Sequence, residues 1–178
     1  MKIYTRKGDE GETGLLYGDK VSKNSVLPEA YGTVDEAQAI LGLVRTECDK
    51  ESDLESKIIH IERDLYVLMA ELATDPSNHG KLVSGKSKVN EEMIKFLEEL
   101  IDEITDSFEL PKEFVLPGQN RIAALLDISR TVVRRAERRA IACDISDSLA
   151  VAYLNRLSDL LWVMARWQEG ESITSKSV

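Results

Sequence analysis

The densest group of chemically capable side chains is a basic run in the second half of the chain. Residues 130–139 read Arg-Thr-Val-Val-Arg-Arg-Ala-Glu-Arg-Arg. On a helix, Arg130, Arg134 and Arg138 follow one another at steps of four along one face, and Glu137 lies on that face too. Arginine offers planar donors for phosphate oxygens, and a carboxylate can orient neighbouring guanidinium groups. The run therefore indicates either a polyphosphate site or a solvated face with individually weak Glu–Arg pairs.

A second candidate phosphate site lies near the N-terminus. Residues 5–14 read Thr-Arg-Lys-Gly-Asp-Glu-Gly-Glu-Thr-Gly, and Lys20 and Lys23 follow. Closely spaced glycines let successive N–H groups converge on phosphate oxygens, while Thr, Arg and Lys side chains add charge-assisted hydrogen bonds. A charged terminus with turns is equally compatible with this composition.

Three other patterns give weaker evidence for a functional site. Residues 80–87 satisfy the phosphate-loop pattern, but a helix and a polar turn precede them where that motif requires a buried strand. Asn155, one turn before Asp159, must find a structural partner or a ligand. His60 and His79 lack a Glu three residues earlier, which excludes the di-iron carboxylate class.

The composition favours one soluble domain. The chain has 178 residues, 43% hydrophobic and 31% charged, and its formal net charge of −9 disfavours nucleic acid or an anionic membrane as partners. We find no apolar run typical of a signal peptide or a membrane span, and Cys48 and Cys143 are too few for a disulfide framework. These features predict a cytoplasmic protein with reduced thiols.

Helical periodicity dominates after the first 28 residues, so we expect an all-α, five-helix, up-and-down bundle. Asn120 and Ser146 are the expected N-caps of the last two helices. Apolar residues at steps of three and four predict helices over residues 29–48, 51–74, 90–108, 120–143 and 146–169.

We expect a single domain over residues 1–178. Residues 1–28 are predicted as an extended N-terminal segment with turns and at most a short strand over residues 2–4. Residues 29–170 are predicted as the bundle, and residues 171–178 as a frayed, flexible tail.

Several segments, taken in order, resemble the PduO-type ATP:cob(I)alamin adenosyltransferases. They are Tyr4–Gly11, Glu29–Glu36, Phe114–Gly118, Arg130–Arg138 and Tyr153–Asp159. The resemblance covers nearly the whole chain and implies a homotrimer of five-helix bundles with active sites between neighbouring subunits. It also implies the reaction, in which the 5′-deoxyadenosyl group of ATP passes to the cobalt of cob(I)alamin and triphosphate leaves.

The resemblance implies roles for individual residues. Asp35 and Arg130 would form a catalytic ion pair across the subunit boundary, and Phe114 would contact cobalamin and exclude its lower axial ligand from cobalt. Without the resemblance, Phe114 would be interpreted as a core anchor. Arg134 and Glu137 would be both catalytic and nucleotide-binding. The full set of implied ATP contacts is Thr5, Arg6, Lys7, Gly8, Thr13, Gly14, Lys23, Arg134, Glu137, Arg138 and Asn155.

The same resemblance implies ATP and Mg²⁺ as co-substrate and cofactor, with cations and Mg²⁺ stabilising the departing triphosphate. The sequence identifies no protein ligand for the metal. A cob(II)alamin reductase and an adenosylcobalamin-dependent enzyme are the implied partners.

Two positions depart from the family pattern, both near the corrinoid side. Gln119 stands where a second Gly usually follows Gly118, and Asp127 stands where His is common. These departures leave open a non-catalytic ATP-binding or cobalamin-delivery module, with a purely structural bundle as a third alternative.

Overall fold

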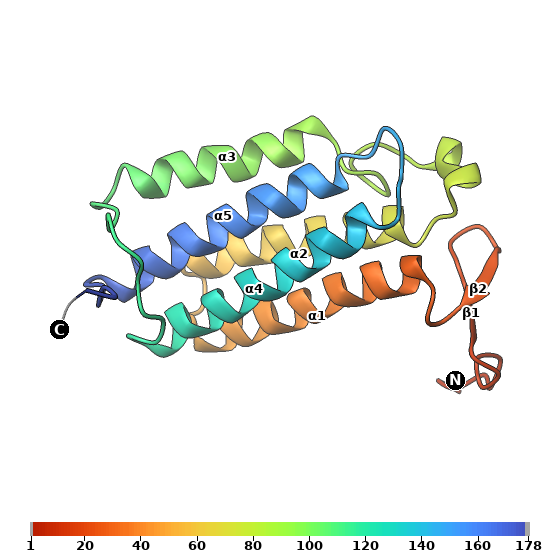
Figure 1. Cartoon of the computed structure of the whole chain (residues 1–178), viewed down its shortest axis with the longest axis horizontal. Coiled ribbons are helices and arrows are strands. Elements are labelled where there is room, and N and C mark those ends of the chain that lie inside the picture. The colour runs from red at the N-terminus through yellow and green to blue at the C-terminus, as the bar shows by residue number, and fades with distance from the viewer. Residues whose placement is uncertain (1, 177–178) are drawn as a thin grey trace.

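A computed structural model describes residues 2–176. In these residues, long helices run up and down along one axis and confirm the expected all-α bundle (Figure 1). Their bounds are Val26–Glu47 for α1, Asp53–Leu72 for α2, Glu91–Thr105 for α3, Arg121–Ile141 for α4 and Ala150–Glu169 for α5. A short 3₁₀ helix, η1 (Pro76–Lys81), lies in the polar connection between α2 and α3. The phosphate-loop pattern at residues 80–87 thus begins within the last turn of η1, not after a strand.

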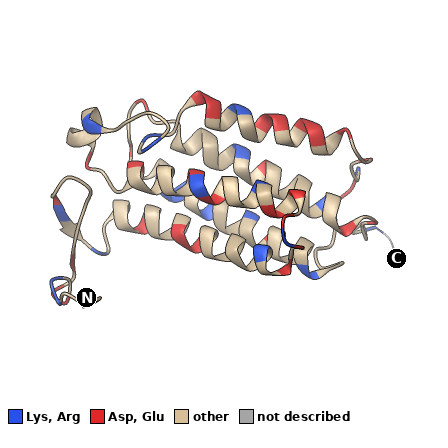
Figure 2. Ribbon diagram, turned by 180° about the vertical axis from the view of Figure 1, so that it is seen from behind, with Lys and Arg blue, Asp and Glu red and all other residues tan. Residues whose placement is uncertain are grey.

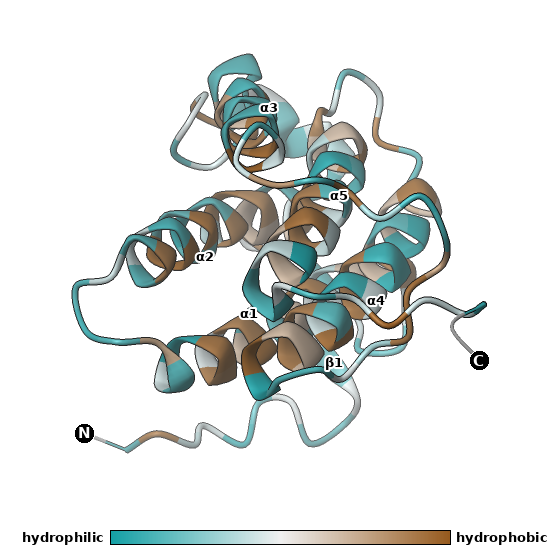
Figure 3. Ribbon diagram, turned by 90° about the vertical axis from the view of Figure 1, so that its left-hand side faces the viewer, coloured by the Kyte–Doolittle hydropathy of each residue, from teal (hydrophilic) through white to brown (hydrophobic). Residues whose placement is uncertain are grey.

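The apolar stripes of the helices meet inside the bundle. Helix α4 packs between α1 and α5, and α3 packs on α5. Leu41, Leu65, Leu126 and Leu157, each from a different helix, are fully buried, and Figure 3, which looks along the bundle, shows apolar residues facing inward. Acidic residues gather on α3 (Figure 2). Between residues 2 and 176, no helix has the length and apolar character needed to cross a bilayer.

Capping side chains set most helix starts. Ser52, Asn90 and Asn120 each accept a hydrogen bond from the backbone N–H three residues further on, which confirms the cap expected at Asn120. Helix α1 begins at Val26, three residues before the predicted start, because Pro28 is accommodated in its first turn.

The expected cap at Ser146 is wrong. Asp147 has φ 57°, which interrupts a right-handed helical path, and α5 begins only at Ala150. The N–H of Ala150 donates to the hydroxyl of Ser148 at 3.1 Å, so a serine two residues later contributes to this helix start.

Both ends of the chain differ from expectation. Residues 2–4 form no strand; instead β1 (Glu12–Gly14) and β2 (Lys20–Ser22) form an antiparallel hairpin. Near the C-terminus, Val115 pairs with Thr174, and the N–H of Ser175 donates to the Phe114 carbonyl at 2.7 Å. The tail predicted to fray therefore pairs with the segment before α4 up to residue 176; residues 1 and 177–178 lie outside the described residues.

Glu71 links two connections at one end of the bundle. Its side chain is fully buried and accepts hydrogen bonds from the Val89 N–H and the Ser148 hydroxyl, both at 2.7 Å. Glu71→Ala would leave these donors without an acceptor, so we expect it to lower the free energy of unfolding by about 1–3 kcal/mol. Urea denaturation, with the exposed Glu99→Ala as control, checks this; equal midpoints for the two variants would contradict it.

Candidate active site

The N-terminal segment forms a pocket of about 400 Å³. Six of its seven predicted nucleotide residues line this pocket, together with Glu12 and Lys20. The seventh, Arg6, is not among the lining residues, and its guanidinium lies over the Tyr4 ring, 5.7 Å from the centroid. The six are Thr5, Lys7, Gly8, Thr13, Gly14 and Lys23.

Local contacts shape this pocket. The Lys23 ammonium donates to the Gly8 carbonyl at 2.7 Å, and a Cβ at residue 8 would lie only 2.9 Å from that ammonium. A side chain at residue 8 would therefore displace the flexible end of the lysine from this position. Lys20 pairs with Glu12 at 3.5 Å. The residues that line the pocket nevertheless include more cations than carboxylates, so the pocket suits an anion.

The predicted site residues of α4 and α5 come together. The Asn155 amide donates to the Glu137 carboxylate at 3.1 Å, which joins the two helices. The Arg138 guanidinium donates to the carbonyl of Arg134 at 2.9 Å, and both arginines are exposed. Asn155 thus has a protein partner that is itself a predicted nucleotide contact.

The C-terminal end of α4 lies beside the start of α1. Arg139 pairs with Glu29 at 3.1 Å, and the Cys143 thiol donates to the Val26 carbonyl at 3.6 Å. Burial raises the pKa of Cys143 to about 11, so this thiol is protonated at neutral pH. The arginine-rich end of α4 and the N-terminal segment therefore share one end of the bundle (Figure 1).

Phe114 lies at the other end. The segment that carries it precedes α4, and α4 alone spans about 30 Å between the two ends (Figure 1). The Phe114 side chain is 88% exposed, so the core-anchor interpretation is wrong. It lines a groove of about 540 Å³ together with Pro111 and Trp162. One chain therefore does not bring Phe114 to the N-terminal pocket.

Asp35 and Arg130 are not paired within the chain. Asp35 is exposed and lines a groove with Gln38 and Tyr66. Arg130 lies against a different groove, and its nearest carboxylate is Asp127, at 3.1 Å. Within the described residues, Asp35 and Arg130 thus belong to separate surfaces.

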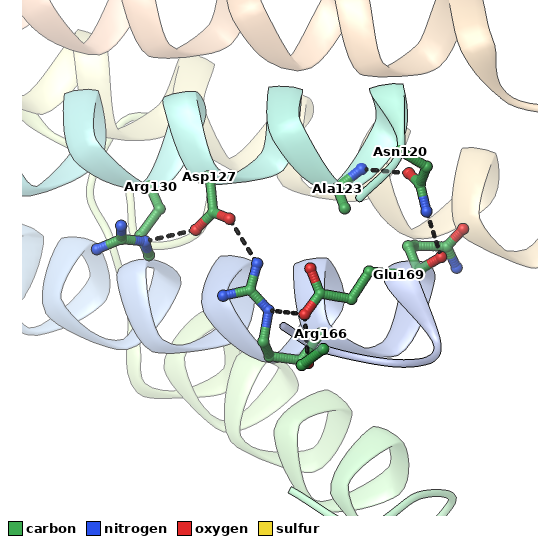
Figure 4. A network of polar contacts seen from close by, with 8 residues as sticks. Asn120, Ala123, Asp127, Arg130, Arg166 and Glu169 are labelled. Atoms are coloured by element: carbon green, nitrogen blue, oxygen red, sulfur yellow. Dashed lines mark hydrogen bonds and ion pairs between the residues drawn. The ribbon is translucent and has the colours of Figure 1, made fainter. Parts of the chain in front are cut away.

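A buried ion network lies behind Arg130 (Figure 4). The guanidinium of Arg166 is 2.5 Å from Asp127 and 2.9 Å from Glu169, and all three side chains are almost fully buried. Asp127 also accepts from Arg130, so its two oxygens serve two guanidinium groups. The departure at position 127 therefore supplies the negative charge that a buried arginine requires.

Sequence reasoning missed Arg166 and Glu169. A signal existed, because Arg166 follows six consecutive apolar residues, Leu160–Ala165, and such a helix has no solvent-facing side at that point. The other departure, Gln119, causes no strain: the positive φ in its loop falls on Gly118, at 116°.

The geometry defines a class of protein, a helical bundle with a lysine-rich pocket at one end. The family model for cobalamin adenosyltransferase matches residues 3–168. The chain therefore belongs to the cobalamin adenosyltransferase family.

Individual relatives agree over almost the full length. A corrinoid adenosyltransferase from Citrobacter freundii is 41% identical over 171 residues, which cover 94% of this chain and 95% of that protein. One from Bacillus subtilis is 38% identical over 93% of this chain and 86% of that protein. A variant PduO-type ATP:corrinoid adenosyltransferase from Lactobacillus reuteri, complexed with cobalamin and ATP, superposes with a TM-score of 0.87 at 29% identity, covering 98% of this chain and 97% of that one.

Removal of the buried guanidinium tests the network. Arg166→Met would leave the carboxylates of Asp127 and Glu169 buried without their shared cation, so we expect a loss of about 3–5 kcal/mol in the free energy of unfolding. Arg156→Ala on the same helix removes exposed pairs with Glu98 and Asp159 and should cost less than about 1 kcal/mol. Chemical denaturation of both variants checks this; a similar loss in both would refute the role of burial.

Proposed function

We propose that the chain transfers the 5′-deoxyadenosyl group of ATP to the cobalt of cob(I)alamin, forming adenosylcobalamin and triphosphate. The observation that carries this proposal is the N-terminal pocket, in which six residues implied as nucleotide contacts converge in a member of this family. The Lactobacillus reuteri relative with cobalamin and ATP bound supports both substrates.

Charge stabilisation is the main task of the protein side chains in this reaction. Co(I) attacks C5′ with its electron pair, the C5′–O bond breaks, and triphosphate leaves with the bonding pair. In the proposal, Lys7, Lys23, Arg134 and Arg138 hold the triphosphate and stabilise the charge that grows on it. Glu137, held by Asn155, orients the neighbouring guanidinium groups. No proton is transferred at the reacting carbon, so no general acid or base is needed.

We propose that each site forms between two chains of a homotrimer. The exposed Phe114 and the N-terminal pocket occupy opposite ends of one chain, which supports the supply of the two halves by different copies. The separate grooves of Asp35 and Arg130 support an ion pair between copies. An interface between two different surfaces is heterologous, and it closes into a ring when the rotation permits.

The described residues do not build a site for Mg²⁺. Between residues 2 and 176 there is no group of three His, Cys, Asp or Glu side chains that could hold a metal ion. We therefore derive no step through the metal, which would enter with the phosphates of ATP. A cytoplasmic location, a cob(II)alamin reductase and an adenosylcobalamin-dependent enzyme as partners belong to the same proposal and rest on the sequence.

An anaerobic assay tests the reaction itself. Chemically reduced cob(I)alamin and MgATP are mixed with the protein, and the visible spectrum is followed. Light-sensitive adenosylcobalamin is the expected product. If MgATP raised the melting temperature but no product formed, the chain would be a binding module; if neither occurred, it would be a structural bundle.

Arg134→Ala removes an exposed cation proposed to hold the triphosphate. We expect it to lower kcat/KM by at least about 100-fold while the trimer stays intact by size-exclusion chromatography with light scattering. Arg135→Ala is the matched control, because Arg135 pairs with Glu36 of its own chain. Unchanged turnover of the Arg134 variant would remove this residue from the site.

Phe114→Ala tests the exclusion of the lower axial ligand. A four-coordinate Co(II) species is easier to reduce, so we expect the variant to lose more activity when the assay starts from cob(II)alamin with a reductant than from prereduced cob(I)alamin. Leu116 is an exposed apolar neighbour, and Leu116→Ala should change little in either assay or in the ratio of the activities from cob(II)alamin and cob(I)alamin. Equal losses of the Phe114 variant in both assays would show that it has no role in ligand exclusion.

A further inference from the structure

The turn between β1 and β2 is attached to the connection between α2 and α3. The N–H of Leu16 donates to the Ala73 carbonyl at 2.8 Å, and Leu16 forms a parallel bridge with Thr74. The Tyr17 hydroxyl donates to the carbonyl of Lys81 at 3.1 Å. Figure 1 shows the hairpin at the end of the bundle where this connection lies.

A series of side-chain hydrogen bonds also joins the β1–β2 turn to this connection. The Lys81 ammonium donates to the Asn78 side-chain oxygen at 2.5 Å, and the Asn78 amide donates to the Asp19 carboxylate. Asp19 and Asn78 are both partly buried. A hydrogen bond to a charged acceptor in such surroundings is stronger than one in water.

The attached turn adopts a conformation that its sequence disfavours. Tyr17 has φ 73° and the following Gly18 has φ 95°. A bulky side chain rarely occupies this left-handed region without support from its surroundings. The Lys81 ammonium, 5.4 Å from the centroid of the Tyr17 ring, and the Lys81 carbonyl provide that support.

The strands that leave this turn carry the nucleotide pocket. Gly14 and Lys20 are paired across the hairpin, directly beside the turn, and both line the pocket. The connection itself is fixed to the core, because Val89 near its end donates to the buried Glu71. The position of the turn therefore sets the position of the pocket relative to the bundle.

We propose that the α2–α3 connection positions the nucleotide pocket, and that Asp19 and Asn78 are the positioning residues. This inference rests on the proposed function, in which the pocket holds ATP. It gives a role to η1, which holds the hairpin through Asn78 and Lys81. Lys86 of the phosphate-loop pattern is not among the residues that line the pocket.

A side-chain exchange tests this pair. Asn78→Asp sets two carboxylates against each other, and we expect it to raise the KM for ATP by roughly tenfold, the size expected for loss of one hydrogen bond to a charged group. The kcat at saturating ATP and prereduced cob(I)alamin should stay within about twofold, since the reacting groups are unchanged. The double variant Asp19→Asn, Asn78→Asp restores one donor opposite one acceptor and should recover most of the KM.

Lys86→Ala is the matched control on the same connection, and we expect its KM for ATP to equal that of the wild type. The melting temperature of each variant without ATP separates global unfolding from misplacement of the pocket. An unchanged KM in Asn78→Asp, no recovery in the double variant, or an equal rise of KM in Lys86→Ala would each overturn the proposal. Failure of the wild type to form product or to be stabilised by MgATP would instead overturn the proposed function.

Discussion

The length of a packed helix is the constraint on which the arrangement of the site depends. Helix α4 packs between α1 and α5, so its 21 residues form a rigid spacer of about 30 Å. The arginine-rich end of this spacer lies at the same end of the bundle as the N-terminal segment, and the other end follows the segment with Phe114. A corrinoid that must meet both ATP and Phe114 therefore requires either a long reach or a second chain, and the family resemblance favours the second chain.

The distribution of charge separates structural from substrate-facing cations. The chain carries a net charge of −9, so attraction for a triphosphate must come from local groups. Arg166 is neutralised by Asp127 and Glu169 in the core and contributes stability alone. Arg134 and Arg138 remain exposed, and Lys23 donates to a neutral carbonyl in the pocket. These three cations lie toward the end of the bundle where the proposal places the leaving group.

Much of this architecture was predictable from local pattern. The five helices follow from apolar periodicity, and the cap at Asn120 follows from its side-chain chemistry. The predicted start of α5 was wrong because the spacing of apolar residues does not reveal the left-handed conformation of Asp147. The three-residue strands of the hairpin were missed because they are too short to alternate.

Long-range pairs explain the remaining differences. The bond between Asn78 and Asp19 joins residues 59 apart, and the ion pair of Arg166 with Asp127 joins residues 39 apart. No periodicity encodes such partners. Six of the seven N-terminal residues implied by the resemblance line one pocket, but only the fold revealed that Phe114 lies at the opposite end and that Asp35 and Arg130 belong to different surfaces.

The most direct test of a site shared between chains is complementation in mixed trimers. Lys7→Glu, which reverses a charge in the nucleotide pocket, and Phe114→Ala are co-expressed with different tags, and assemblies containing both are purified. If each site takes its pocket from one chain and Phe114 from the next, every mixed trimer has both wild-type halves at about one third of its sites, and cob(II)alamin-dependent activity rises above that of either variant. An activity no higher than the average of the two variants would contradict a shared site.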